Sequence, residues 1–250
     1  MPSIFTVSPD FTPDHLYGWY IFNTWLQKKT EEPIRLIMYD NFLNQRQAIE
    51  EDVIDLIYAN PYDAAVLVRE KGFKPLVKPE GCLDEAIIAV NANNQVEDVA
   101  DLQAGVRIAV TDDPDVSMMG MIMLEPGDLD STNVQLISCG NYILVAKQLI
   151  QGHADVGIFF AEAFDDMSNV VKKQLRVLVR SQISIIHHSL MVGSKLRAKH
   201  GLLQQVLLNM DSNDKGKKVL QSLGFKQWLI VDDEEMEFMI DLMDTLENSG

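Results

Sequence analysis

The 250-residue sequence predicts an α/β protein made of two lobes. Apolar runs of strand length alternate with amphipathic stretches of helix length, which is typical of an α/β fold. The same order of strands and helices also occurs twice, about a hundred residues apart. Each copy reads strand, helix, strand, helix, strand. We therefore expect each lobe to hold a mostly parallel sheet flanked by helices.

The first copy begins with an apolar strand at residues 4–7. A helix is expected to start near residues 13–14, where proline suits a first turn and aspartate favours the positive helix end. The second strand is expected at 34–39, a short helix through 42–49, and the third strand at 55–59.

The second copy repeats this order. We expect a strand at 107–110, a helix at 117–124, a strand at 134–138, a helix at 142–150 and a strand at 155–159. An aspartate opens the third strand in both copies. The identical placement supports a duplicated unit, although few other residues are repeated.

Two long apolar segments, at 84–90 and 183–192, bracket the second copy. A two-strand hinge needs two such connections, so we expect the chain to cross to the second lobe and return through them. The predicted lobes are residues 1–88 plus 188–250, and residues 89–187.

The composition excludes several functions. With 37 acidic and 21 basic residues the formal net charge is −16, which would repel nucleic acid and an anionic membrane surface. No apolar stretch approaches the roughly 20 residues of a membrane span. The N-terminus has no signal-peptide pattern, so we expect a cytoplasmic protein, or a periplasmic one whose signal peptide was removed. Cys82 and Cys139 are two buried thiols or one disulfide.

The sequence contains no motif of a catalytic or cofactor site. A nucleotide-binding glycine loop, a nucleophile elbow and a zinc-protease helix motif are all missing from it. We therefore expect no enzyme activity, no cofactor and no metal.

Candidate ligand contacts follow from topology, because ligands of open α/β sheets sit beyond the carboxyl ends of the strands. The candidate ligand-binding residues are Ser8, Asp10, Tyr58, Asn60, Tyr62, Asp115, Ser117, Asn141, Glu162 and His187.

Several of these side chains have a structural role as an alternative. Tyr58 and Tyr62 are expected either to contact a ligand or to pack the loop. Asn60 is expected to cap the helix after Pro61 and could still present its amide. Glu162 fits a ligand contact and a solvated helix start equally well.

The acidic loop at 112–115 and the adjacent His187 and His188 also have two interpretations each. Asp112, Asp113 and Asp115 could attract an amine or a cation, but at least one of Asp113 and Asp115 is expected to cap the helix that opens after Pro114. Strand alternation sends His187 and its neighbour to opposite faces, so at most one of them is expected to reach a ligand.

Residues 55–62, Asp-Leu-Ile-Tyr-Ala-Asn-Pro-Tyr, resemble the strand and loop of phosphonate-type solute-binding proteins of ABC transporters. Residues 8–10 are similar to the first binding loop of that family, and residues 99–109 to its entry into the second lobe. The likeness spans about residues 3–195. It implies a type II periplasmic-binding fold with ligand held between two hinged lobes.

The likeness fails at the anion pocket. The family uses a run of Ser and Thr at a helix N-terminus, whereas residues 111–120 here keep Ser117 near the expected helix start, crowded by three carboxylates. The family also has a His just before its next helix, where this chain has Asn141. We therefore expect the ligand not to be a simple phosphonate.

The leading hypothesis is a non-catalytic solute-binding protein, monomeric or homodimeric, with a small-molecule ligand and a transporter or sensor partner. Two alternatives stay open. One is a cytoplasmic enzyme on the same fold, like the dehydratases of menaquinone synthesis or the thiamine-pyrimidine synthases, which rests on fold analogy. The other is a sensory or partner-binding domain without a ligand.

Overall fold

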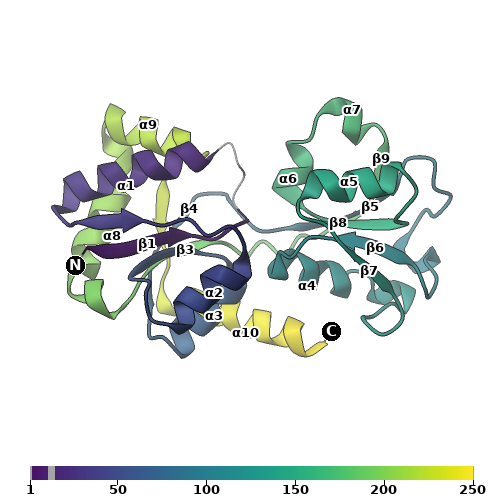
Figure 1. The fold of residues 1–250 in the computed structure, drawn as a ribbon, viewed down its shortest axis with the longest axis horizontal. Helices are drawn as coiled ribbons and strands as arrows, with labels where there is room; N and C mark the ends of the chain where they lie inside the picture. The colour runs from purple at the N-terminus through teal and green to yellow at the C-terminus, as the bar shows by residue number, and fades with distance from the viewer. Residues whose placement is uncertain (1, 11–14, 250) are drawn as a thin grey trace. The chain divides into compact units, whose positions relative to one another are not determined.

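The computed structural model describes residues 2–10 and 15–249, so the helix start expected at 13–14 lies outside the described residues. The chain divides into two compact units, which are described separately below (Figure 1). Their bounds are Met1–Leu83 with His187–Asp241 for unit 1, and Asp84–Ile186 with Leu242–Gly250 for unit 2.

Unit 1 holds, within the described residues, a six-stranded sheet in the order β11-β4-β10-β3-β1-β2. Its strands are β1 (Ser3–Val7), β2 (Ile34–Leu36), β3 (Leu56–Ala59), β4 (Lys74–Pro79), β10 (Ser189–Val192) and β11 (Trp228–Ile230). Strands β2, β1 and β3 are parallel, and β10, β4 and β11 join them through antiparallel pairs. Because β4 is antiparallel to β10, it runs in the same direction as β1, β2 and β3. The sheet therefore has the predicted, mostly parallel strand direction, with β10 and β11 running the opposite way.

Helices cover both faces of this sheet (Figure 1). They are α1 (Leu16–Thr30), α2 (Phe42–Glu50), α3 (Pro61–Arg69), α8 (His200–Leu208) and α9 (Asp214–Ser222). One more helix, α10 (Asp233–Ser249), begins in unit 1. Helices α1 and α9 lie on one face, and α2 and α3 lie on the other.

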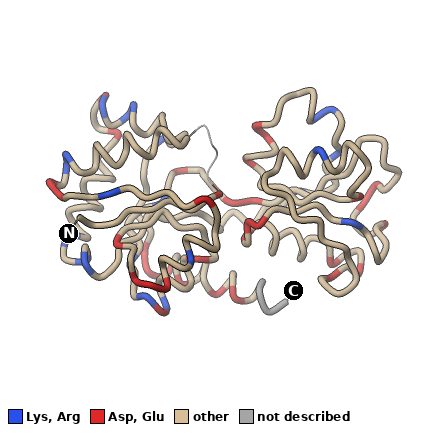
Figure 2. Tube along the Cα trace, viewed as in Figure 1, with Lys and Arg blue, Asp and Glu red and all other residues tan. Residues whose placement is uncertain are grey.

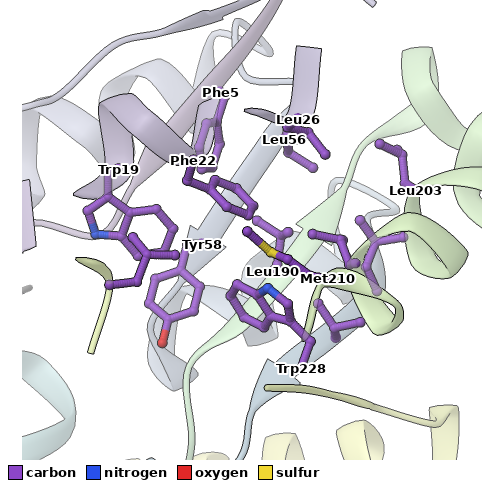
Figure 3. Close-up of a cluster of buried hydrophobic side chains, with 14 of the residues drawn as sticks. Phe5, Trp19, Phe22, Leu26, Leu56, Tyr58, Leu190, Leu203, Met210 and Trp228 are labelled. Carbon is purple, nitrogen blue, oxygen red and sulfur yellow. The ribbon is translucent and has the colours of Figure 1, made fainter. Parts of the chain in front are cut away.

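An aromatic cluster fills the α1 face of unit 1 (Figure 3). Trp19 of α1 packs against Phe22 with ring centroids 5.6 Å apart and against Tyr58 of β3 at 4.8 Å. Tyr58 in turn lies 6.2 Å from Trp228 of β11. Tyr58 is therefore a core residue of unit 1, although it belongs to the strand that leads into a candidate binding loop.

Unit 2, described throughout residues 84–186, holds a five-stranded sheet in the order β7-β6-β8-β5-β9. Its strands are β5 (Ala86–Asn91), β6 (Arg107–Val110), β7 (Gln135–Ser138), β8 (Val156–Phe160) and β9 (Leu175–Arg180), and its α-helices are α4 (Pro114–Ile122), α5 (Tyr142–Ile150), α6 (Ala161–Asp165) and α7 (Asn169–Lys172). As in unit 1, the three strands of the repeat (β7, β6 and β8) are parallel. Strand β5 pairs antiparallel with both β8 and β9, so β9 runs in the same direction as the repeat strands and β5 runs the opposite way.

Two helices of unit 2 pack on opposite faces of its sheet (Figure 1). On one face Gly120 of α4 lies so close to Ile158 that a Cβ would come within 2.4 Å of its side chain. On the other face α5 packs on Phe159, and the buried Val145 and Leu149 belong to the same cluster. The period-two alternation of β8 accounts for the two faces.

The segment at 183–192 differs from its sequence prediction. Only Ser189–Val192 forms a strand, and the preceding residues are irregular. Ser184 has a φ of 58°, in the left-handed region that interrupts an extended strand. Its N–H donates to Glu85 Oε1 at 2.7 Å, so the irregular backbone is held by a carboxylate rather than by a sheet partner.

Acidic residues are distributed over both units (Figure 2). Within the described part of the chain, no helix is both long and apolar enough to cross a membrane. Neither Cys82 nor Cys139 takes part in a disulfide in the described structure.

Candidate ligand-binding site

In unit 1 the loops after β1 and β3 are joined by hydrogen bonds. The Ser8 N–H donates to the Tyr58 carbonyl oxygen at 2.8 Å. The Asn60 side-chain N–H donates to Ser8 Oγ at 3.2 Å, and both residues are fully buried. The two loops therefore form one rigid edge of the sheet.

Asn60 is also the N-cap of α3. Its Oδ1 accepts the Asp63 N–H at 2.7 Å, and its Nδ2 donates to Asp63 Oδ2 at 3.0 Å. Pro61 follows as the first helical residue, where its missing N–H is not needed. The capping role expected for Asn60 is confirmed, and both ends of its amide are occupied by this role and by Ser8.

Arg46 of α2 reaches the same helix start. Its Nε donates to Asp63 Oδ1 at 2.6 Å. The guanidinium also lies over two rings, 5.4 Å from the centroid of Phe42 and 4.7 Å from that of Tyr62. Burial raises the pKa of Asp63, while the charge of Arg46 and its hydrogen bond act in the opposite direction. Tyr62 is half-buried, so its ring packs the loop as well as bordering the site.

A second group in unit 1 joins Asp10, Tyr58 and His188. His188 Nε2 lies 3.0 Å from Asp10 Oδ2, and the His188 ring stacks on Tyr58 with centroids 5.2 Å apart. Tyr58 is 7% exposed. The stack therefore places the histidine ring between the aromatic core and the Asp10 carboxylate.

His187 has different neighbours. It is fully buried, with Nδ1 3.1 Å from Ser189 Oγ and Nε2 3.6 Å from Glu235 Oε1 of α10. The structure thus places His188, not the predicted His187, beside Asp10 and Tyr58. Alternation does separate the two rings, but the face that His187 occupies leads toward α10.

In unit 2 the start of α4 is capped by a carboxylate. Asp113 Oδ1 accepts the Val116 N–H at 3.3 Å, and Asp113 Oδ2 accepts the Tyr142 hydroxyl at 2.8 Å. Asp113 is 5% exposed, and Asp115 in the first helical turn is 2% exposed. The helix begins at Pro114, three residues earlier than predicted, because this cap lies before the proline.

The other predicted residues of unit 2 have local roles. Ser117 Oγ donates to the Thr111 carbonyl at 3.3 Å. Asn141 caps α5 by accepting the Leu144 N–H at 3.0 Å and is exposed. Glu162 is exposed in the first turn of α6, where a carboxylate favours the positive helix end.

Three residues that form hydrogen bonds in these loops were not identified from the sequence: Arg46, Asp63 and Tyr142. Asp63 was detectable, because it stands at the third helical position after an asparagine cap. Arg46 and Tyr142 had no such signal, since each acts on a residue far away in the sequence.

The geometry is that of an α/β binding protein: two units, each with loops at the carboxyl ends of its parallel strands carrying buried, mutually bonded polar groups. A family model for "ABC transporter, phosphonate, periplasmic substrate-binding protein" matches residues 5–236. The chain therefore belongs to this family of ABC-transporter solute-binding proteins. The family binds small molecules and works with an ABC transporter.

Solved structures support the type II periplasmic-binding fold. The chain is similar to PhnD1 from Prochlorococcus marinus in complex with methylphosphonate, with a TM-score of 0.81, 13% identity and 98% of each chain covered. It is also similar to XAC2383 from Xanthomonas citri bound to chloride ion, with a TM-score of 0.80, 15% identity and 99% of each chain covered.

A third similar structure is a binding protein component of an ABC phosphonate transporter (PA3383) from Pseudomonas aeruginosa. Its TM-score is 0.79 at 15% identity, with 98% of this chain and 87% of that chain covered. No curated protein sequence matches the chain significantly. At these identities the likenesses show the fold and not the ligand.

Proposed function

We propose that this chain is a non-catalytic solute-binding protein whose ligand is not a simple phosphonate. Its ligand contacts come from loops at the carboxyl ends of its parallel strands, and its partner is an ABC transporter. The single observation that carries the ligand claim is the Asp113 carboxylate at the start of α4.

A helix N-terminus binds an oxyanion through backbone N–H groups that have no partner in the helix. Here the Val116 N–H already has an acceptor, the carboxylate of Asp113. The Tyr142 hydroxyl, another donor that could serve an anion, is directed at the same carboxylate. The Asp113 carboxylate therefore occupies the N-terminus of α4 at which a phosphonate would bind.

Neighbouring charges act in the same direction. Asp115 is buried in the first turn of the same helix, and Asp112 is exposed one residue before the cap. A phosphonate beside these groups would meet like charge in a partly desolvated place, which costs several kcal/mol. A ligand with an uncharged or positively charged group at this helix avoids that cost.

The experiment is native mass spectrometry of the freshly purified protein, followed by a thermal-shift panel of oxyanions, amines and neutral vitamin precursors. We expect no stabilisation by methylphosphonate, phosphate or sulfate, and stabilisation by an amine or a neutral solute. Asp113→Asn tests the cause, because it removes the negative charge and keeps a side chain able to accept the Val116 N–H. Asp112→Asn is the matched control for loss of an exposed charge.

Saturable stabilisation of the wild-type protein by methylphosphonate would overturn the proposal. The proposal would also be overturned if Asp113→Asn did not bind oxyanions more tightly than Asp112→Asn does.

A further inference from the structure

We infer that Arg46 recognises an uncharged oxygen acceptor of the ligand, such as a carbonyl or amide oxygen. This inference rests on the proposed function, because it assumes that the chain binds a solute at its carboxyl-end loops. It assigns to Arg46 a recognition role in unit 1.

Arg46 is fixed in position by three neighbours. The Asp63 carboxylate accepts its Nε–H at 2.6 Å, and the rings of Phe42 and Tyr62 contact its guanidinium. The preceding residue, Gln45, anchors α2 by donating to the Val7 carbonyl oxygen at 2.8 Å, at the carboxyl end of β1. Arg46 thus lies at the edge of the sheet where ligands of this fold class bind.

The guanidinium has unused donors. Among the described residues Arg46 donates a hydrogen bond only through Nε, and its Nη2 is buried without an acceptor. A buried donor without a partner is rare and unfavourable, and more so when it is charged. Nη2 itself is buried, but the side chain as a whole is 35% exposed, so a ligand can approach Arg46 from its exposed side.

Arg107 of unit 2 provides the contrast. Its Nε donates to Asp155 Oδ2 at 3.0 Å, and its Nη2 donates to Asp155 Oδ1 at 2.7 Å and to the Gly152 carbonyl at 3.1 Å. The aspartate of that pair occupies both nitrogens. In the Arg46 pair the second Asp63 oxygen is turned to Asn60 instead, which leaves Nη2 for another acceptor.

Charge decides the kind of acceptor. Asp63 already balances the charge of Arg46, and the nearby Asp10 charge further disfavours a negative group. A ligand carboxylate or phosphonate would therefore add like charge to a compensated pair. An uncharged carbonyl oxygen accepts the same hydrogen bond without that repulsion.

The test uses three matched sets of small probes with isothermal titration calorimetry. The amides are glycinamide, β-alaninamide and γ-aminobutyramide; the free acids are glycine, β-alanine and γ-aminobutyrate; and the amines are ethylamine, propylamine and butylamine. Isotope-labelled protein gives a second readout, the NMR signal of the Arg46 Nε–H, assigned by its disappearance in Arg46→Lys. Arg107→Lys is the matched control, because the Nε and Nη2 of Arg107 already have acceptors within the protein.

We expect at least one amide to bind and to shift the Arg46 signal, with the matched acid and amine binding about tenfold more weakly, as one charge-assisted hydrogen bond requires. Arg46→Lys lowers the affinity for the amide about tenfold, whereas Arg107→Lys leaves it unchanged.

Three outcomes overturn the inference: an acid that binds as tightly as its amide, an amide that binds without moving the Arg46 signal or responding to Arg46→Lys, or no binding by any amide. None of these contradicts the proposed function, which is tested separately by oxyanions such as methylphosphonate and by Asp113→Asn.

Discussion

The Asp155 carboxylate holds both the backbone and the side chain of Arg107. It accepts the Arg107 N–H at 3.0 Å and the Arg107 Nη2 at 2.7 Å. Asp55 does the equivalent in unit 1, accepting the Ile4 N–H at 2.8 Å. Each aspartate precedes the third strand of its repeat and ties it to the first strand, which explains why the same residue type occurs in both copies.

Asp155→Asn should lower the free energy of unfolding by about 1 kcal/mol at neutral pH. The expected loss is this small because the Arg107–Asp155 pair is partly exposed and solvent weakens it. The hydrogen bonds from Arg107 hold the pKa of Asp155 below its usual range. A lowered carboxyl pKa contributes stability above the unfolded pKa of about 3.9, and that contribution is lost as pH falls through the folded value. Urea unfolding at neutral and acid pH measures this difference.

The difference in the free energy of unfolding between the wild-type protein and Asp155→Asn should therefore disappear at acid pH. The exposed Asp112→Asn serves as the control for removal of one charge. A difference that is constant with pH would show that the Asp155 contacts do not depend on ionisation.

Tyr58→Ala should destabilise unit 1 by about 3–5 kcal/mol, as expected for removing a buried aromatic side chain. Its ring packs against Trp19, His188 and Trp228. Tyr62→Ala, at a half-buried ring, should cost only about 1–2 kcal/mol. Thermal unfolding of both variants checks the order, and a Tyr58→Ala protein as stable as Tyr62→Ala would contradict the core assignment.

Gly18→Ala should also destabilise unit 1, by roughly 1–3 kcal/mol. A Cβ at this position of α1 would lie 2.0 Å from the Ser222 carbonyl oxygen of α9, and a backbone atom cannot move aside cheaply. Gly201→Ala is the matched control, because it is also near a helix start but has no atom within 4 Å. Its stability should be unchanged or slightly raised; equal effects of the two changes would refute the close helix contact.

Asn60→Ala should cost more than Asn141→Ala. Both residues cap a helix, which is worth about 1 kcal/mol. Asn60 is fully buried and also bonds Ser8 and the Asp63 carboxylate, so its removal leaves buried polar groups without a partner. Chemical denaturation of the two variants compares them, and equal losses would mean that the buried bonds of Asn60 add nothing to its cap.

Sequence periodicity predicted the bounds of a repeated element best where that element buries one defined apolar face, as the helix at 142–150 does. The strand at 107–110 and the helix at 142–150 have the predicted bounds. The prediction of a long strand at 183–192 was wrong for most of that segment, because its apolar residues do not alternate within a sheet. Glu85, which is remote in the sequence, holds residues 183 and 184 in another conformation through hydrogen bonds from their N–H groups. Strand β9 was not predicted at all.

Topology selected the loops after the parallel strands as the candidate site, and that location stays a prediction. Asn60 was identified as a cap from its proline neighbour, and the structure confirms the cap. Whether His187 or His188 reaches Asp10 depends on how the strand enters the sheet, which no local pattern encodes. The same is true of Arg46 and Tyr142, whose aspartate partners are brought to them by the tertiary fold.

The central claim is that the family fold here carries a site that rejects phosphonates. Isothermal titration calorimetry of methylphosphonate into the wild-type protein at neutral pH tests it most directly. Because Asp113 supplies its own carboxylate to the start of α4, we predict no saturable binding, with a Kd weaker than about 1 mM, or about −4 kcal/mol. Saturable binding with a Kd of about 1 μM, or about −8 kcal/mol, would contradict the account.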